Sequence, residues 1–189
     1  MTLPDGTVVT KDDGPRPGVT MEAVAALPPV FRPNGRVTAA NCCPLNDGAA
    51  AVVVMSDTKA RELGLTPLAR IVATGVSALS SEIMGYGPVE ASRRALARAG
   101  MTIGDIDLVE INEAFAAQVI PSYRDLGIDL DRLNVNGGAI AVGHPFGMTG
   151  ARITTTLINS LQFHDKQSGL ETMCVGGGQG MALVLERLS

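Results

Sequence analysis

Aromatic residues are scarce in this sequence: they make up 3% of the 189 residues, and tryptophan is absent. A hydrophobic core must therefore be built from alanine, valine, leucine, isoleucine and methionine. Hydrophobic residues still amount to 46% of the chain and charged residues to only 18%, which excludes a disordered composition. With 22 glycines, this composition favours helices packed closely on a sheet over an all-β sandwich.

Positive charge is also in short supply, since 15 Lys and Arg residues face 19 Asp and Glu residues. No basic stripe is available to neutralise phosphates along a duplex, so we expect no nucleic acid as partner. A single anionic ligand remains compatible with the sequence, because it needs only a local Arg or a helix N-terminus. No apolar run is long enough to span a bilayer, so we expect no membrane partner.

Metal-ligating and disulfide-forming residues are few. Neither His144 nor His164 has a Cys, His or carboxylate at the close spacing of a zinc or iron site, so we expect no metal and no cofactor. The three cysteines are Cys42, Cys43 and Cys174, an odd count in which two are neighbours. The first residues are polar and do not resemble a secretion signal, so we expect a cytoplasmic localisation.

Strand-like and helix-like patterns alternate along the chain from Asp47. Strands are predicted at 49–55, 68–76, 106–111, 170–175 and 181–188, and helices at 56–64, 88–100, 115–119 and 150–161, with a short helix at 21–27. This alternation predicts an α/β architecture in which a mixed five-stranded sheet carries helices on its faces. Ligands of such sheets gather beyond the carboxyl ends of the strands, where Asn112 and Cys174 fall.

Three segments carry residues suited to chemistry. They are Asn112-Glu113-Ala114-Phe115, the glycine-rich stretch from Asn134 to Gly147 around His144, and Met173-Cys174-Val175-Gly176-Gly177-Gly178. A histidine between glycines can accept a proton near neutral pH beside a bulky ligand. A thiol at a strand end, beside exposed backbone N–H groups, can act as an acid or base while an N–H stabilises an oxyanion.

Each segment also has a purely structural interpretation. Cys174 could be a small buried hydrophobe, Asn112 a turn or cap residue, and the loop around His144 a tight turn. A nucleotide-binding loop is disfavoured, because the segment lacks the Lys-Ser/Thr ending of a P-loop and contains no G-x-G-x-x-G pattern. The three glycines after Cys174 weaken a strand unless its backbone approaches something closely.

Taken together, in this order and spacing, the three segments resemble the C-terminal half of the thiolase family, whose members join or cleave acyl units on coenzyme A. The stretches 14–18 and 41–51 also match family segments that lead out of its loop domain. The resemblance implies a thiolase-like layered fold. It places the end of the loop domain at 1–45, the last strand and helix of the N-terminal domain at 46–66, and the C-terminal domain at 67–189.

The resemblance also implies residue roles. His144 would activate a nucleophilic cysteine and form an oxyanion hole with water held by Asn112. Cys174 would move the proton of the Claisen step, and the Gly176 N–H would contribute to a second oxyanion hole. Coenzyme A, a substrate and not a cofactor, would be contacted by Arg16, Ala39, Cys43, Ala114 and Phe115, with Cys43 standing where many members carry a serine.

The implied function is that of an acyl-CoA C-acyltransferase in fatty-acid or other lipid metabolism, working as a homo-oligomer. The family's nucleophilic cysteine belongs to the N-terminal half, so we expect these 189 residues alone to be inactive. One alternative is a non-catalytic module that binds acyl-CoA or a partner chain. Another is a condensing enzyme of the ketoacyl-synthase type, disfavoured because such enzymes use a second histidine where Cys174 stands.

Overall fold

The computed structural model describes residues 1–12 and 14–189, which form two compact units, Met1–Ala40 and Asn41–Ser189. In the first unit, helix α1 (Met21–Ala25) begins where the Thr20 hydroxyl accepts a hydrogen bond from the Ala23 N–H. An isolated bridge joins Thr2 and Val8. Hydrophobic side chains in the described part of this unit are exposed or half-buried, so the core of the chain lies in the second unit.

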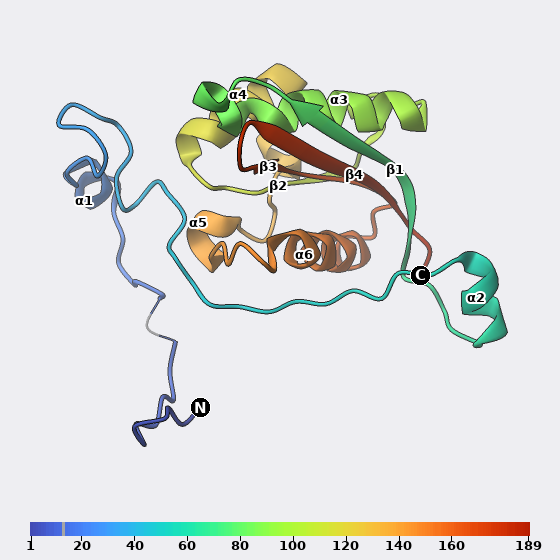
Figure 1. Ribbon diagram of the computed structural model, residues 1–189, viewed down its shortest axis with the longest axis horizontal. Coiled ribbons are helices and arrows are strands. Elements are labelled where there is room, and N and C mark those ends of the chain that lie inside the picture. Colours follow the sequence, from blue (N-terminus) through green and yellow to red (C-terminus); the bar gives the residue numbers. More distant parts are fainter. Residues whose placement is uncertain (13) are drawn as a thin grey trace. The chain divides into compact units, whose positions relative to one another are not determined.

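The second unit contains one sheet with helices on both faces. Its strands are β1 (Ala69–Ala78), β2 (Leu108–Ile111), β3 (Ser168–Val175) and β4 (Gln179–Arg187). Its α-helices are α2 (Asp57–Glu62), α3 (Gly87–Ala99), α4 (Ala116–Leu126), α5 (Ala139–Val142) and α6 (Thr149–Phe163), and its 3-10 helices are η1 (Ser81–Tyr86), η2 (Ile103–Asp105) and η3 (Leu130–Arg132). Figure 1 shows α3 and α4 on one face of the sheet, and α5 and α6 on the other.

The sheet is mixed, with the strand order β1-β4-β3-β2. β4 is antiparallel to both of its neighbours, whereas β2 and β3 run parallel. The carboxyl ends of β2 and β3 therefore meet at one edge of the sheet, as the sequence predicts. The turn from β3 into β4 lies at the same edge.

Local sequence signals explain where the elements begin and end. Pro88 occupies the first turn of α3, and Gly100 ends the helix in the left-handed conformation with φ of 67°. A capping box begins η2: Asp105 accepts hydrogen bonds from the Thr102 N–H at 2.7 Å and the Thr102 hydroxyl at 2.8 Å.

Two hydrophobic clusters hold the helices to the sheet. The larger joins α3 and α4 to one face and includes Val89, Ile111 and Leu170, all at most 1% exposed. The smaller joins α6 to the other face through Leu157 and Leu161, both 0% exposed. Complete burial of a side chain of this size contributes roughly 1.5–3 kcal/mol, so the aliphatic residues are sufficient without tryptophan.

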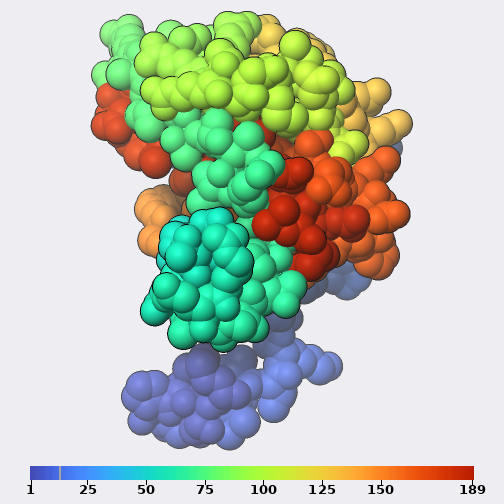
Figure 2. Space-filling view, turned by 90° about the vertical axis from the view of Figure 1, so that its right-hand side faces the viewer, coloured from blue at the N-terminus to red at the C-terminus, as the bar shows by residue number. Residues whose placement is uncertain are grey.

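The prediction of five strands is wrong by one, because the run from Ala49 to Met55 forms no strand. Its valines are exposed, with Val53 at 85% and Val54 at 69%. A strand requires a neighbour that pairs with its N–H and C=O groups, and no described residue pairs with this run. It remains extended beneath α6 in Figure 1, and α2, which follows it, forms a lobe at the surface in Figure 2.

Candidate active site

Asn112 and Cys174 lie at the joined carboxyl ends of β2 and β3. The Asn112 N–H donates to the Thr172 carbonyl at 3.0 Å, which continues the ladder one residue past β2 and places Asn112 beside the segment that carries Cys174. The Asn112 side chain is 1% exposed, and neither its oxygen nor its nitrogen has a hydrogen-bond partner among the described residues. A buried amide in this state is suited to hold a water molecule or a substrate oxygen.

The Cys174 thiol is 7% exposed. Burial raises its pKa, and the charge of a Cys43 thiolate would raise it further. The thiol is therefore protonated at neutral pH. This state suits a group that gives a proton to carbon, and it does not suit a nucleophile, which acts as the thiolate.

The three glycines after Cys174 have different roles. Gly177 and Gly178 form the turn between β3 and β4 with φ of 83° and 93°, and a side chain on Gly178 would collide with the Leu79 carbonyl. Gly176 has no atom within 4 Å of the position that a Cβ would occupy. The backbone beside Cys174 is thus open to an approaching ligand at Gly176, whereas the following two glycines are explained by the turn and its packing.

His144 lies in the loop that joins α5 to α6. Its side chain is only 8% exposed, and its Nδ1 lies 2.7 Å from the Thr149 hydroxyl oxygen. Burial lowers its pKa, and the positive charge of Arg152 lowers it further, so the imidazole is neutral at pH 7. A neutral imidazole can accept a proton, as the sequence analysis requires.

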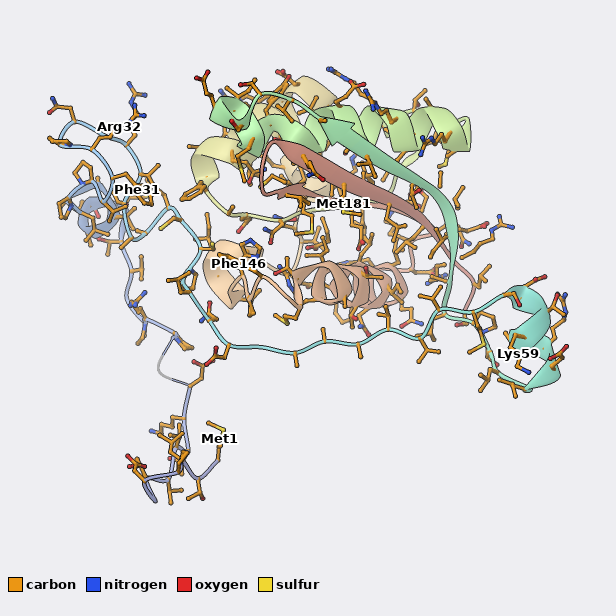
Figure 3. All side chains as sticks on the ribbon, viewed as in Figure 1. Met1, Phe31, Arg32, Lys59, Phe146 and Met181 are labelled. Carbon is orange, nitrogen blue, oxygen red and sulfur yellow. The ribbon has the colours of Figure 1, made fainter. Side chains whose placement is uncertain are left out.

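Glycine is required just before this histidine. Gly143 has φ of 97°, and a Cβ there would lie 2.5 Å from the Asn46 side-chain oxygen. The His144 ring contacts the Phe146 ring edge-on, with 4.8 Å between the ring centroids. Figure 3 shows Phe146 at the end of the second unit where the β3–β4 turn also lies.

Glu113 ties the His144 loop to the segment that carries Asn112. One of its carboxylate oxygens accepts a hydrogen bond from the Asn134 side chain at 2.8 Å, and the other accepts the Ile140 N–H at 3.0 Å. Asn134 in turn bridges both backbone groups of Ile111, the last residue of β2, at 2.8 and 3.0 Å. The His144 loop is therefore held to the carboxyl end of β2, beside the end of β3 that carries Cys174.

The residues predicted to contact coenzyme A separate into two groups. Cys43, Ala114 and Phe115 come together, because the Cys43 N–H donates to the Ala114 carbonyl at 3.1 Å and Cys42 forms a bridge with Phe115. All three are partly exposed, and burial together with the neighbouring Cys42 raises the pKa of Cys43. Arg16 and Ala39 are exposed residues of the first unit, and their role stays a prediction.

Other kinds of site receive little support in the part of the chain that is described. No three His, Cys, Asp or Glu side chains there are grouped to hold a metal ion, and no described helix is long and apolar enough to cross a membrane. A cavity of about 310 Å³ is lined by residues that include Ile106, Arg132 and Lys166, near the start of β2. It lies at the opposite end of that strand from Asn112.

Comparison with known proteins agrees with this arrangement. A family model described as "Thiolase, C-terminal domain" matches residues 65–187, and one described as "Thiolase, N-terminal domain" matches residues 2–58. The chain belongs to the thiolase family. Among solved structures, the acetyl-CoA acetyltransferase of Bacillus anthracis superimposes with a TM-score of 0.91 at 48% identity, over 94% of this chain and 45% of that one. This thiolase chain therefore has the thiolase fold.

Other thiolases show the same degree of similarity. The acetyl-CoA acetyltransferase of Thiocystis violacea is 52% identical over 97% of this chain and 47% of its own length, and the 3-ketoacyl-CoA thiolase of Shewanella baltica is 54% identical over 95% and 48%. The human mitochondrial 3-ketoacyl-CoA thiolase in complex with CoA gives a TM-score of 0.88 at 43% identity, over 96% of this chain and 46% of that one. This thiolase chain spans about half the length of the relatives it matches.

Sequence reasoning missed two residues of this thiolase site. The sequence indicates Glu113 only as part of a motif, although its two hydrogen bonds hold the loops together. The sequence motifs assign no role to Thr149. Its position five residues after His144, at the start of a helix, is a signal that could have been used, because a hydroxyl there can reach back toward the preceding loop.

Proposed function

We propose that the chain is the C-terminal part of an acyl-CoA C-acyltransferase that interconverts 3-ketoacyl-CoA plus CoA with two acyl-CoA molecules. In the cleavage direction, a nucleophilic cysteine attacks the 3-keto carbon, the bond between carbons 2 and 3 breaks, and the Cys174 thiol gives its proton to carbon 2 of the departing acetyl-CoA. CoA then takes the acyl group from the cysteine. His144 accepts the proton of the nucleophilic cysteine in the first attack and returns it when that cysteine leaves in the second. The proton of the CoA thiol restores Cys174.

The observation that carries this proposal is the presence of a buried neutral base, His144, and a buried protonated thiol, Cys174, on segments that meet at the adjoining carboxyl ends of β2 and β3. The unpartnered Asn112 side chain and the open Gly176 backbone supply groups for developing negative charge. Cys43, Ala114 and Phe115 are proposed to line the path of the pantetheine chain. Arg16 and Ala39 are proposed to lie near the nucleotide part of coenzyme A.

The nucleophile is proposed to come from a segment other than these 189 residues. The chain has three cysteines, and burial raises the pKa of both Cys43 and Cys174. An activated nucleophile needs the opposite shift. Cys42 is held in a backbone bridge to Phe115, in the segment proposed for pantetheine binding.

The organisation of the whole protein is part of the proposal. We assign residues 1–45 to the end of a loop domain, 46–66 to the last strand and helix of the N-terminal domain, and 67–189 to the C-terminal domain, which agrees with the family matches at 2–58 and 65–187. The exposed valines of the 49–55 run are proposed to pair with a further strand, and the enzyme to form a homo-oligomer. Three free cysteines support a cytoplasmic, reducing environment.

A chimera tests the proposed function. The part of the Thiocystis violacea relative that precedes the matched region is fused ahead of this chain, and thiolysis of acetoacetyl-CoA by CoA is measured. We expect turnover by the chimera, none by the 189 residues alone, and a loss of at least 100-fold in kcat for His144→Asn or Cys174→Ser. His164→Asn is the matched control. Equal turnover by the chain alone, or a chimera that binds CoA without turnover, would contradict it.

A further inference from the structure

A buried chain of two hydrogen bonds runs behind His144. The Thr149 hydroxyl donates to the Pro145 carbonyl at 2.9 Å, and the same oxygen lies 2.7 Å from Nδ1 of His144. Thr149 is 0% exposed and His144 is 8% exposed, so water does not readily replace either partner. The arrangement joins three residues of one loop, from the histidine to the first residue of α6.

The number of protons in these two hydrogen bonds decides which ring nitrogen of His144 is protonated. A threonine hydroxyl has one proton, and a carbonyl oxygen can only accept. Because the Thr149 proton is directed to Pro145, the hydroxyl oxygen faces His144 as an acceptor. Nδ1 must then carry a hydrogen, and in the neutral ring the lone pair is left on Nε2.

We propose that Thr149 is a positioning residue that holds neutral His144 in its Nδ1-protonated tautomer, so that Nε2 is the atom that takes the proton from the attacking thiol. The second half of this statement rests on the proposed function, whereas the tautomer does not. In the opposite tautomer, the Thr149 proton must turn to Nδ1 and leave the Pro145 carbonyl without its bond, or two acceptors face each other at 2.7 Å. In either case Nε2 would be unable to accept a proton. Thr149 therefore acts through His144 without contacting the reacting atoms.

A merely structural role for Thr149 makes a different prediction. Valine has nearly the shape of threonine but no hydroxyl, so Thr149→Val preserves the packing at the start of α6 and removes the acceptor. Serine keeps the acceptor and loses a methyl group. If Thr149 only packs, serine is the more harmful substitution; if it sets the tautomer, valine is.

Nuclear magnetic resonance of the 189-residue chain tests the tautomer directly. The ring nitrogens are labelled with ¹⁵N, and two-bond ¹H–¹⁵N correlations are recorded at a pH where His144 is neutral; His164→Asn assigns the two histidines. We expect a protonated Nδ1 and an unprotonated Nε2 in the unaltered chain and in Thr149→Ser. In Thr149→Val we expect a shift toward protonated Nε2, with the circular dichroism spectrum unchanged.

A protonated Nε2 in the unaltered chain, or the same tautomer in Thr149→Val, overturns the proposal. If Thr149→Val does not fold, the unaltered chain and Thr149→Ser still decide the outcome, because both must show protonated Nδ1. In the chimera we expect Thr149→Val to lower kcat by on the order of 10- to 100-fold with little change in KM, and Thr149→Ser to stay within a few-fold. An inactive unaltered chimera would count against the proposed function alone, since the tautomer is measured without turnover.

Discussion

Two glutamates are buried between the sheet and α6, and they make the stability of this chain depend on pH in an unusual direction. Glu110 and Glu171 pair across the parallel strands β2 and β3 and are 2% and 7% exposed. Burial raises the pKa of Glu110 to about 7 and that of Glu171 to about 8. The nearby Arg152 guanidinium, 4.0 Å from Glu110, lowers both only in part.

The hydrogen bonds of Glu171 support a protonated carboxyl group. The Thr154 hydroxyl lies 2.8 Å from the Gly150 carbonyl and 2.8 Å from a Glu171 oxygen, and its single proton cannot serve both acceptors. If Glu171 carries a proton, it donates to Thr154 while Thr154 donates to Gly150. Both contacts are then satisfied without a buried negative charge.

The sign of the pH dependence follows from this protonation. The ordinary glutamate pKa is 4.5, so between pH 4.5 and about 8 the unfolded chain releases a proton that the folded chain keeps at Glu171. The free energy of unfolding therefore falls as pH rises, by at most about 1.4 kcal/mol per pH unit for one group. Over this window the loss from Glu171 is on the order of 5 kcal/mol. The stabilisation is complete below pH 4.5 and gone above about 8.

Glu171→Gln is the perturbation that isolates this effect, since the amide stays neutral and can still donate to Thr154. We expect it to be close to the unaltered chain in stability at pH 5 and more stable by about 2–4 kcal/mol at pH 8. Urea unfolding followed by circular dichroism at several pH values measures the difference. His144, with its lowered pKa, contributes a slope of opposite sign below pH 6.5, but it is common to both proteins and cancels. Glu90→Gln, on the exposed face of α3, is the control.

The reasoning is refuted if the unaltered chain has a flat stability profile between pH 5 and 8. It is also refuted if Glu171→Gln shows the same slope as the unaltered chain, because the titrating group would then lie elsewhere. A variant that is less stable than the unaltered chain at every pH would show that Glu171 is ionised and paired in the folded state.

Two further predictions concern neighbouring features. A Cβ on Gly180 would overlap the carbonyl of Gly87, the first residue of α3, whereas a Cβ on Gly176 would meet open space. Thermal unfolding should therefore show that Gly180→Ala loses about 3 kcal/mol or more of stability and that Gly176→Ala is nearly unchanged. Arg152→Met removes a cation that lowers the pKa of His144, so titration by nuclear magnetic resonance should give a higher His144 pKa. An unchanged pKa would mean that burial alone lowers it.

Most of the fold could be predicted from the sequence because its signals are local. Proline at the start and glycine at the end of α3, and the capping box at Thr102, determine backbone geometry within a few residues. The run from Ala49 to Met55 has an equally strong local preference, but a strand also needs hydrogen-bonding neighbours from elsewhere in the chain. The run has the local preference for a strand, but no described residue pairs with it, so the predicted strand does not form.

The site was predicted less completely than the fold. The glycine-bordered His144 and Cys174 stand out in the sequence because reactive side chains next to flexible backbone are unusual. Glu113 binds groups 21 and 27 residues away, so its partners depend on which loops meet at the strand end, and that is a property of the tertiary structure. Thr149 lies only five residues after His144, but its hydroxyl reaches the ring only because of how the loop turns into α6.

Three side-chain hydroxyl groups of helix α6 make the same pair of contacts, and this repetition supports the tautomer proposed for His144. Thr149, Thr154 and Ser160 each donate their hydroxyl proton to the carbonyl four residues earlier, at 2.9, 2.8 and 2.8 Å. Each oxygen is then left as an acceptor toward a second side chain. For Ser160 that side chain is the amide of Asn136, which donates at 2.7 Å.

The other two partners, His144 and Glu171, can either donate or accept, and the helix geometry selects the donating form of each. Burial keeps Glu171 protonated, so it can donate to Thr154 while Thr154 donates to Gly150. In the same way, Thr149 donates to Pro145 and leaves Nδ1 of His144 as the donor. A hydroxyl that turned its proton to its partner would give up its bond to the carbonyl four residues earlier. The two claims are consequently linked: if Glu171 titrates like an ordinary carboxylate while Thr154 keeps its bond to Gly150, the case for the His144 tautomer weakens as well.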